Sequence, residues 1–152
     1  MAYSLDTIED AMIAALDVSP INTYAKTIKT YSGQLAQDVN KVLLILPAIL
    51  VVFGGDEFRS PIGANTVFNR VMDWDVLVAA RNLRGDVGAR HGVGSEVGVY
   101  EMLDDVRSKL VGQKLSLNIE PLRIVRRRPV LIDARAYIYA LRFQTMCDYV
   151  QT

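Results

Sequence analysis

Three segments of the chain repeat apolar residues every three or four positions, which is the spacing of an amphipathic helix. They are residues 5–16, 35–46 and 99–110. Pro47 comes directly after the second segment, and Gly112 follows the third by two residues. Proline cannot continue a helix, and glycine is common just past a helix end. The pattern therefore predicts three helices at these places.

Other segments favour extended structure. Residues 67–81 alternate between apolar and polar side chains, as a half-buried antiparallel strand does. Trp74 falls on one face of this predicted strand, whereas Asp73 and Asp75 fall on the other. Runs rich in β-branched, aromatic or apolar residues predict further extended segments, with a turn near Pro129–Asp133 between the last two. These segments are residues 21–31, 48–53, 121–128 and 134–146.

The order of these elements predicts an α+β fold. We expect an antiparallel sheet of four to five strands, with two to three helices packed largely on one face. Internal repeats, low-complexity segments and linker-like stretches are absent from the sequence. All 152 residues are therefore predicted to form one domain, which is long enough to bury a core.

Composition narrows the class of protein. Half of the residues are apolar, so the chain should fold, and its formal net charge of zero argues against a general nucleic-acid or membrane-surface binder. The single cysteine, Cys147, excludes an internal disulfide and fits a reducing cytoplasm. We expect no signal peptide, because no amino-terminal apolar segment precedes a cleavage site. The apolar run at residues 42–53 is too short to span a bilayer.

A glycine-rich stretch at residues 85–98 comes closest to a nucleotide motif. Gly92, Gly94 and Gly98 form G-x-G-x-x-x-G ahead of a predicted helix, whose amino end attracts anions. The dinucleotide fingerprint, however, places G-x-G-x-x-G directly after a strand of a parallel βαβ unit, and here the strand ends near Arg81. The lysine-bearing phosphate loop is also missing. We therefore expect no nucleotide and no other cofactor.

The same stretch holds an Arg-Gly-Asp triplet and the only histidine of the chain. A chain without an export signal does not reach a cell-surface receptor, and one histidine supplies too few ligands for a zinc site. Glycine loses much backbone freedom when it becomes ordered. The sequence therefore predicts that residues 84–96 are mobile in the isolated protein and become ordered against a partner. The candidate contact residues are Arg84, Asp86, Arg90 and His91.

Carboxylate pairs offer a second candidate chemistry. Asp73 with Asp75 and Asp104 with Asp105 have the residue type that acid–base catalysis uses. Such pairs more often mark a solvated face or a subunit contact. A dyad of Cys147 and His91 is formally possible, but no nucleophile motif surrounds the cysteine. The sequence therefore contains no clear catalytic constellation and favours an interaction protein over an enzyme.

Four arginines crowd one predicted strand. Three of them are consecutive, so their side chains point to both faces of a strand, and at least one faces the covered side of the sheet or a neighbouring chain. A solvated turn is one interpretation of this cluster. A contact with an acidic partner surface or with passing DNA is the other. The four residues are Arg123, Arg126, Arg127 and Arg128.

Several stretches in order resemble the tail terminator, or tail completion, proteins of Mu-like bacteriophages and prophages. The resemblance runs over residues 5–146 and rests on IEDAMIAAL, TYSGQL, LPAILVVFGG, VLVAARNLRG, VYEMLDDVRSKLVGQKL and IEPLR, followed by an aromatic-rich closing strand. No single motif is sufficient for the resemblance, which depends on the ordered set. The residues that match, such as Gly54-Gly55, Asn82–Gly85 and Asp104-Asp105, carry over only as fold or contact positions.

The resemblance implies a structural virion protein with an α+β fold and no catalytic residues. Such terminators form a hexameric ring at the head-proximal end of a contractile tail in the neck region. The implied partners are other copies of the chain, the tail tube and sheath, and the head or neck connector, with DNA only passing through the channel. Assembly would take place in the host cytoplasm. The alternatives are another head–tail connector protein and a small enzyme that binds phosphate with the glycine-rich stretch.

Overall fold

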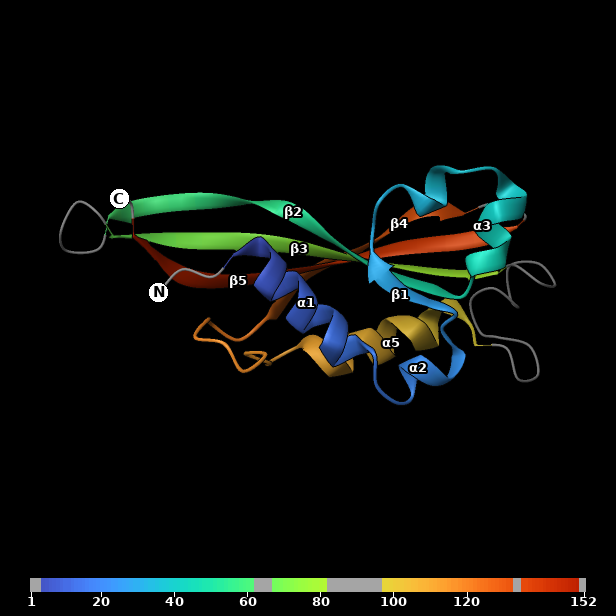
Figure 1. Ribbon diagram of the computed structural model, residues 1–152, viewed down its shortest axis with the longest axis horizontal. Coiled ribbons are helices and arrows are strands. Elements are labelled where there is room, and N and C mark those ends of the chain that lie inside the picture. Colours follow the sequence, from blue (N-terminus) through green and yellow to red (C-terminus); the bar gives the residue numbers. More distant parts are fainter. Residues whose placement is uncertain (1–3, 62–66, 82–96, 133–134, 151–152) are drawn as a thin grey trace.

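A five-stranded sheet with the strand order β1-β2-β3-β5-β4 forms the centre of the protein (Figure 1). The computed structural model describes residues 4–61, 67–81, 97–132 and 135–150. Its strands are β1 (Thr27–Thr30), β2 (Ala48–Pro61), β3 (Val67–Arg81), β4 (Arg123–Ile132) and β5 (Ala136–Val150). Its helices are α1 (Leu5–Leu16), α2 (Ile21–Tyr24), η1 (Gln34–Ala36), α3 (Val39–Ile45) and α5 (Val99–Leu110).

The sheet is mixed, which corrects the expectation of a purely antiparallel one. Strands β2, β3, β5 and β4 pair antiparallel, whereas β1 pairs parallel to β2. The parallel pair requires a crossover connection, and η1 with α3 supplies it between β1 and β2. The predicted α+β class and the number of strands are confirmed.

Helices α1, α2 and α5 pack on one face of the sheet, which we call the covered face (Figure 1). Each contributes apolar side chains to the main core, because the apolar stripes of α1 and α5 turn towards the strands. Trp74 of β3 and Phe143 of β5 are fully buried beneath them. The three predicted helical segments include two of these helices, and the bounds of α5 agree with the prediction.

Among the described residues, α3 together with η1 covers one end of the opposite face of the sheet (Figure 1). There a smaller core joins Val42 and Leu46 to strand residues such as Leu50, Ala79 and Ile138. Beyond α3 the strands β2, β3 and β5 continue and carry polar side chains on this face. We call this uncovered part the open face, and it holds the candidate site.

Several predicted boundaries were wrong. The strand expected at 48–53 runs on to Pro61, and the strand expected at 134–146 spans Ala136–Val150. Residues 21–31 were expected to be extended, but α2 occupies the first part and only Thr27–Thr30 form a strand. Residues 35–46 contain η1 and the shorter helix α3. The strand predicted at 121–128 runs on to Ile132, through the position expected to turn. Pro129 is tolerated there because β4 is an edge strand, where an amide hydrogen bond is dispensable.

Candidate functional site

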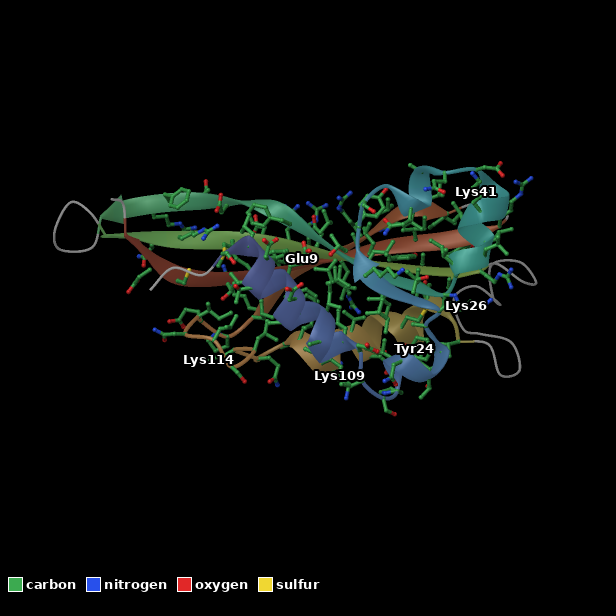
Figure 2. All side chains as sticks on the ribbon, viewed as in Figure 1. Glu9, Tyr24, Lys26, Lys41, Lys109 and Lys114 are labelled. Carbon is green, nitrogen blue, oxygen red and sulfur yellow. The ribbon has the colours of Figure 1, made fainter. Side chains whose placement is uncertain are left out.

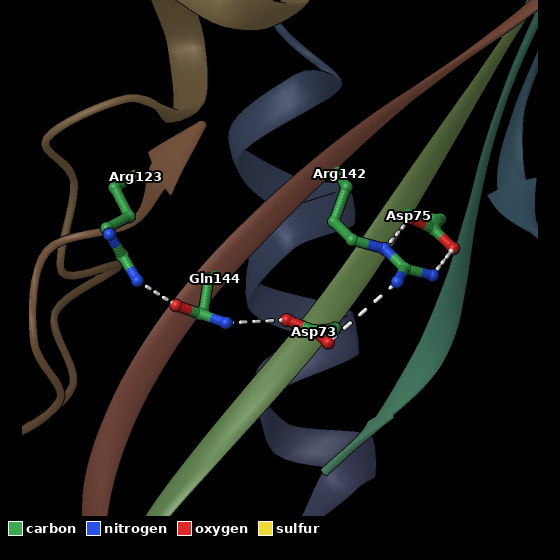
Figure 3. Close-up of polar contacts among 5 residues, drawn as sticks. All are labelled: Asp73, Asp75, Arg123, Arg142 and Gln144. Carbon is green, nitrogen blue, oxygen red and sulfur yellow. Dashed lines mark hydrogen bonds and ion pairs between the residues drawn. The ribbon is translucent and has the colours of Figure 1, made fainter. Parts of the chain in front are cut away.

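Arg142 of β5 is the centre of the polar contacts on the open face (Figure 3). Its Nε donates to Oδ1 of Asp75 at 2.9 Å, and its Nη2 donates to Oδ2 of the same carboxylate at 2.9 Å. The two residues face each other because β3 and β5 pair Asp75 with Arg142. This parallel, two-bond geometry is the strongest that arginine makes with a carboxylate. The hydrogen bond to Asp75 raises the pKa of Arg142 above its usual value, so the site keeps its positive charge.

The contacts continue along the face through Asp73 to β4. Nη1 of Arg142 lies 3.9 Å from Oδ2 of Asp73, and Nε2 of Gln144 donates to Oδ1 of Asp73 at 3.0 Å. Arg123 then donates to the side-chain oxygen of Gln144 (Figure 3). Three strands are thereby joined by side chains. We call these five residues, Asp73, Asp75, Arg123, Arg142 and Gln144, the open-face network.

Glycine at position 54 leaves room for this network. A Cβ at Gly54 would lie 3.1 Å from the carbonyl oxygen of Asp73 and 3.2 Å from Nη2 of Arg142. Gly55 adopts a positive φ of 111°, which glycine tolerates better than other residues, and the register of β2 and β3 shifts at this point. The bulge therefore brings the backbone of β2 close to the ion pair. The pair Gly54-Gly55 was singled out in the sequence only as a fold or contact position.

The four predicted arginines all lie on β4, which forms one edge of the sheet. Arg126 pairs in register with Arg142 and Arg128 with Ala140, so both side chains lie on the same side of the sheet as the open-face network. Arg127 lies on the covered side, where its Nη1 is 3.9 Å from Oδ1 of Asp104 on α5. Both side chains are at least half exposed, so this ion pair contributes little stability.

Strand β4 also exposes apolar side chains. The register with β5 shifts on either side of Val125 and again at Val130, so these two residues have no direct partner in β5. About half of the surface of each residue is exposed, and the same is true of Leu131 and Ile132 at the end of the strand. Bulges, charges and a proline all discourage uncontrolled pairing of an edge strand. The exposed edge thus combines positive charge with apolar surface.

The other predicted site residues separate into distinct environments. Arg84, Asp86, Arg90 and His91 lie outside the described residues, and so does the predicted loop at 84–96. Asp105 accepts a hydrogen bond from the hydroxyl of Tyr24 at 2.9 Å, which ties α2 to α5. Burial and then the Asp105 carboxylate raise the pKa of Tyr24 well above its usual value. Asp105 is therefore a structural acceptor in this fold.

The structure also places the cysteine and the groups considered for metal binding. Cys147 is buried in the main core. No group of three His, Cys, Asp or Glu side chains in the described part of the chain is placed to hold a metal. Within the same ranges, the helices are too short or too polar to cross a membrane. What the described residues offer is a charged surface on the open face and along β4.

The alternation along β3 predicted that Asp73 and Asp75 share a polar face, but it gave no sign of their partners. Arg142 and Gln144 lie about seventy positions further along the chain, as the 67- and 71-residue separations show. Alternation did put Arg142 on the face opposite Tyr137 and Phe143, which was the available signal. Only the pairing register of β3 with β5 identifies which carboxylates it meets.

A family comparison covers almost the whole of this fold. The model of the family described as "Bacteriophage Mu, Gp37" matches residues 4–146, which include every strand and helix from α1 to most of β5. A search of curated proteins found no match. The match confirms the Mu-like bacteriophage part of the resemblance seen in the sequence. The chain therefore belongs to the bacteriophage Mu Gp37 family.

Proposed function

We propose that this Mu-like phage protein is a structural component of the virion, and that it is the tail terminator. In this role a ring of copies, six by the resemblance, caps the head-proximal end of a contractile tail. The ring stops growth of the tube and sheath and offers the surface that joins the neck. The family match over residues 4–146 and the ordered resemblance support this assignment.

The observation that carries the proposal is the exposed β4 edge beside the open-face network. A closed ring needs two different surfaces on each subunit, which meet head to tail. The sheet ends in two different edges, β1 and β4, so each copy presents unlike surfaces on its two sides. Arg126 and Arg128 are exposed on β4 without an ion pair to a described residue. Charged residues left unpaired in a monomer suit a contact that forms only on assembly.

The proposal also assigns roles to the residues predicted as contacts. Arg123, Arg126, Arg127 and Arg128 contact a neighbouring subunit or the channel, and Arg84, Asp86, Arg90 and His91 contact the tube, sheath or neck. The protein carries no catalytic step in this scheme and needs no cofactor. Its partners are copies of itself and the adjacent tail and neck proteins, and DNA only passes through the ring.

Deleting the gene from an inducible Mu-like prophage tests the assignment. Without a terminator, tails should grow beyond their normal length and remain without heads in negative-stain images, and a plasmid copy of the gene should restore normal particles. Headless tails of normal length would instead identify a neck or connector protein. Full infectivity of the deletion strain would exclude both roles.

The position of the protein gives the complementary test. A reconstruction of the intact virion neck should show this fold as a ring between the tail tube and the head, with six-fold symmetry. A different symmetry at that position would contradict the hexamer while leaving the terminator role in place. Saturable binding of ATP by the purified protein in calorimetry would instead favour the phosphate-binding alternative.

A further inference from the structure

The chain separates its charges between two elements. From Ser4 to Ala25 there are four carboxylates and no lysine or arginine. Strand β4, from Arg123 to Ile132, has four arginines and no carboxylate. A net charge of zero for the whole chain conceals this separation. Surfaces of opposite charge attract each other and fix the orientation in which they meet.

The two charged elements belong to different parts of the fold. Helix α1 packs against α5 and against β1 and β2, which lie towards one edge of the sheet, whereas β4 is the other edge. Strands β3 and β5 lie between β2 and β4 in the sheet, and the aspartates of α1 make no ion pair with the described arginines of β4 within one copy. A positive element on one side and a negative element on the other is the arrangement that head-to-tail contact requires.

On α1 the free carboxylates form a single stripe. Asp6 and Asp10 are exposed and four residues apart, which places them above one another on the surface of α1, and the exposed Asp17 caps the carboxyl end of this helix. None of the three makes an ion pair with a described residue. Glu9 is different, because it accepts a hydrogen bond from Thr30 at 2.6 Å on the side of α1 that faces β1 (Figure 2).

On β4 the arginines that share a face have a similar spacing. Arg126 and Arg128 are separated by roughly 7 Å along an extended strand, and Arg123 lies roughly 10 Å before Arg126. On α1, Asp6 and Asp10 are separated by about 6 Å along the helix axis, and Asp17 lies about 10 Å beyond Asp10. Two rows of opposite charge with matched intervals can pair several residues at once.

We propose that β4 of one copy docks against α1 of a second copy, so that the arginine row meets the aspartate stripe. This inference rests on the proposed function, and it names the contact that closes the ring. Joining the two sheet edges directly, β4 to β1, is less favourable because Lys29 lies within β1 and Lys26 directly precedes it, so this edge also carries positive charge. Exposed apolar residues of β4, such as Val125 and Val130, exclude water from the contact and strengthen the ion pairs within it.

Two charge reversals test this contact. The acidic-strand variant carries Arg126→Glu and Arg128→Glu, and the basic-helix variant carries Asp10→Lys and Asp17→Lys. Each variant alone places like charges across every subunit contact, and infectious yield should fall by about a hundredfold or more when it complements the deletion strain. Lysine near the carboxyl end of α1 is compatible with the helix dipole, so this variant should still fold.

Coexpression of the two variants gives the decisive result. The glutamates of the acidic-strand variant can meet the lysines of the basic-helix variant, and the natural β4 of the latter can meet the natural α1 of the former. Yield should return to within about tenfold of the wild type, with the two variants alternating around an even-numbered ring. Native mass spectrometry of rings isolated from the mixture should show equal numbers of both chains.

Controls separate this contact from the proposed function. Thermal melting checks that each variant folds, and Lys41→Glu with Lys114→Glu reverses two exposed charges elsewhere and should leave yield unchanged. Full yield from either variant alone, or no recovery on coexpression of folded variants, overturns the contact while wild-type complementation upholds the terminator role.

If a reversal unfolds the chain, Arg126→Gln with Arg128→Gln replaces it. That neutral variant should lose the salt dependence of assembly between about 0.05 and 0.5 M, and unchanged salt dependence also overturns the contact.

Discussion

The two faces of the sheet are built from the same strands and differ in almost every physical respect. On the covered face, Trp74 and Phe143 are fully buried under α1 and α5. On the open face, the neighbouring residues Asp73, Asp75 and Arg142 form an ion-pair network that remains partly exposed. Alternation of side chains along β3 and β5 produces both surfaces from one stretch of sequence.

The two faces are therefore expected to contribute differently to folding stability and to assembly. Burial of apolar surface is the dominant favourable term in folding, so the covered face supplies most of the stability. Charges at an exposed edge contribute little to a monomer and gain value when a partner excludes water. Substitutions on the covered face should therefore lower the free energy of unfolding strongly. Substitutions on β4 should change it little and should instead weaken assembly.

Trp74→Ala should cause the largest loss of stability. The side chain is fully buried and packs against Phe53 with ring centroids 5.1 Å apart, so its removal leaves a cavity in the main core. The free energy of unfolding should fall by about 3–5 kcal/mol, measured by urea denaturation. Val125→Ala, at a half-exposed position on β4, is the control and should change it by about 0.5 kcal/mol or less. Equal effects at both positions would erase the contrast between the faces.

Arg142→Met should have the next largest effect, because it removes the cation of the open-face network. Asp75, whose side chain is only 14% exposed, would lose both of its hydrogen bonds to arginine. We expect a loss of about 1–3 kcal/mol in the free energy of unfolding. Arg126→Met is the matched control, because Arg126 is its register partner on β4 but has no ion pair to a described carboxylate. A loss as large in the control would show that the network contributes nothing specific.

Tyr24→Phe should cost about 1 kcal/mol at neutral pH through loss of the hydrogen bond to Asp105. Because the pKa of Tyr24 is raised in the folded protein, its stabilising contribution is present below about pH 10 and is lost as the pH rises further. Denaturation at several pH values up to about 11 should therefore show a steeper loss for the wild type than for the variant. An equal loss of stability with pH in both proteins would mean that the hydroxyl of Tyr24 is exposed to water and makes no stabilising hydrogen bond.

Arg126→Gln with Arg128→Gln should have the smallest effect on folding. Both side chains are exposed on the edge strand, so the free energy of unfolding should change by about 0.5 kcal/mol or less. The same variant is expected to weaken assembly, as measured by the yield of infectious particles. A destabilisation of more than about 1 kcal/mol would mean that these arginines support the fold itself.

The sequence alone determined the elements with strong internal periodicity. The strand at Val67–Arg81 and the helix at Val99–Leu110 have the bounds that their patterns predicted, because alternation and the helical repeat persist over 15 and 12 residues. The α+β class followed from the order of such segments. The Mu-like family resemblance, which the family match confirms, was also readable from ordered stretches without any structure.

Tertiary structure decided what local patterns leave open. The segment from Ile21 to Tyr31 became a short helix and a parallel strand because pairing with β2 and packing under α5 outweigh local β preference. Likewise, the polar face of β3 was readable, but its partner Arg142 was not. A period of two assigns a residue to a face, whereas the register between strands distant in sequence decides which charges meet on it.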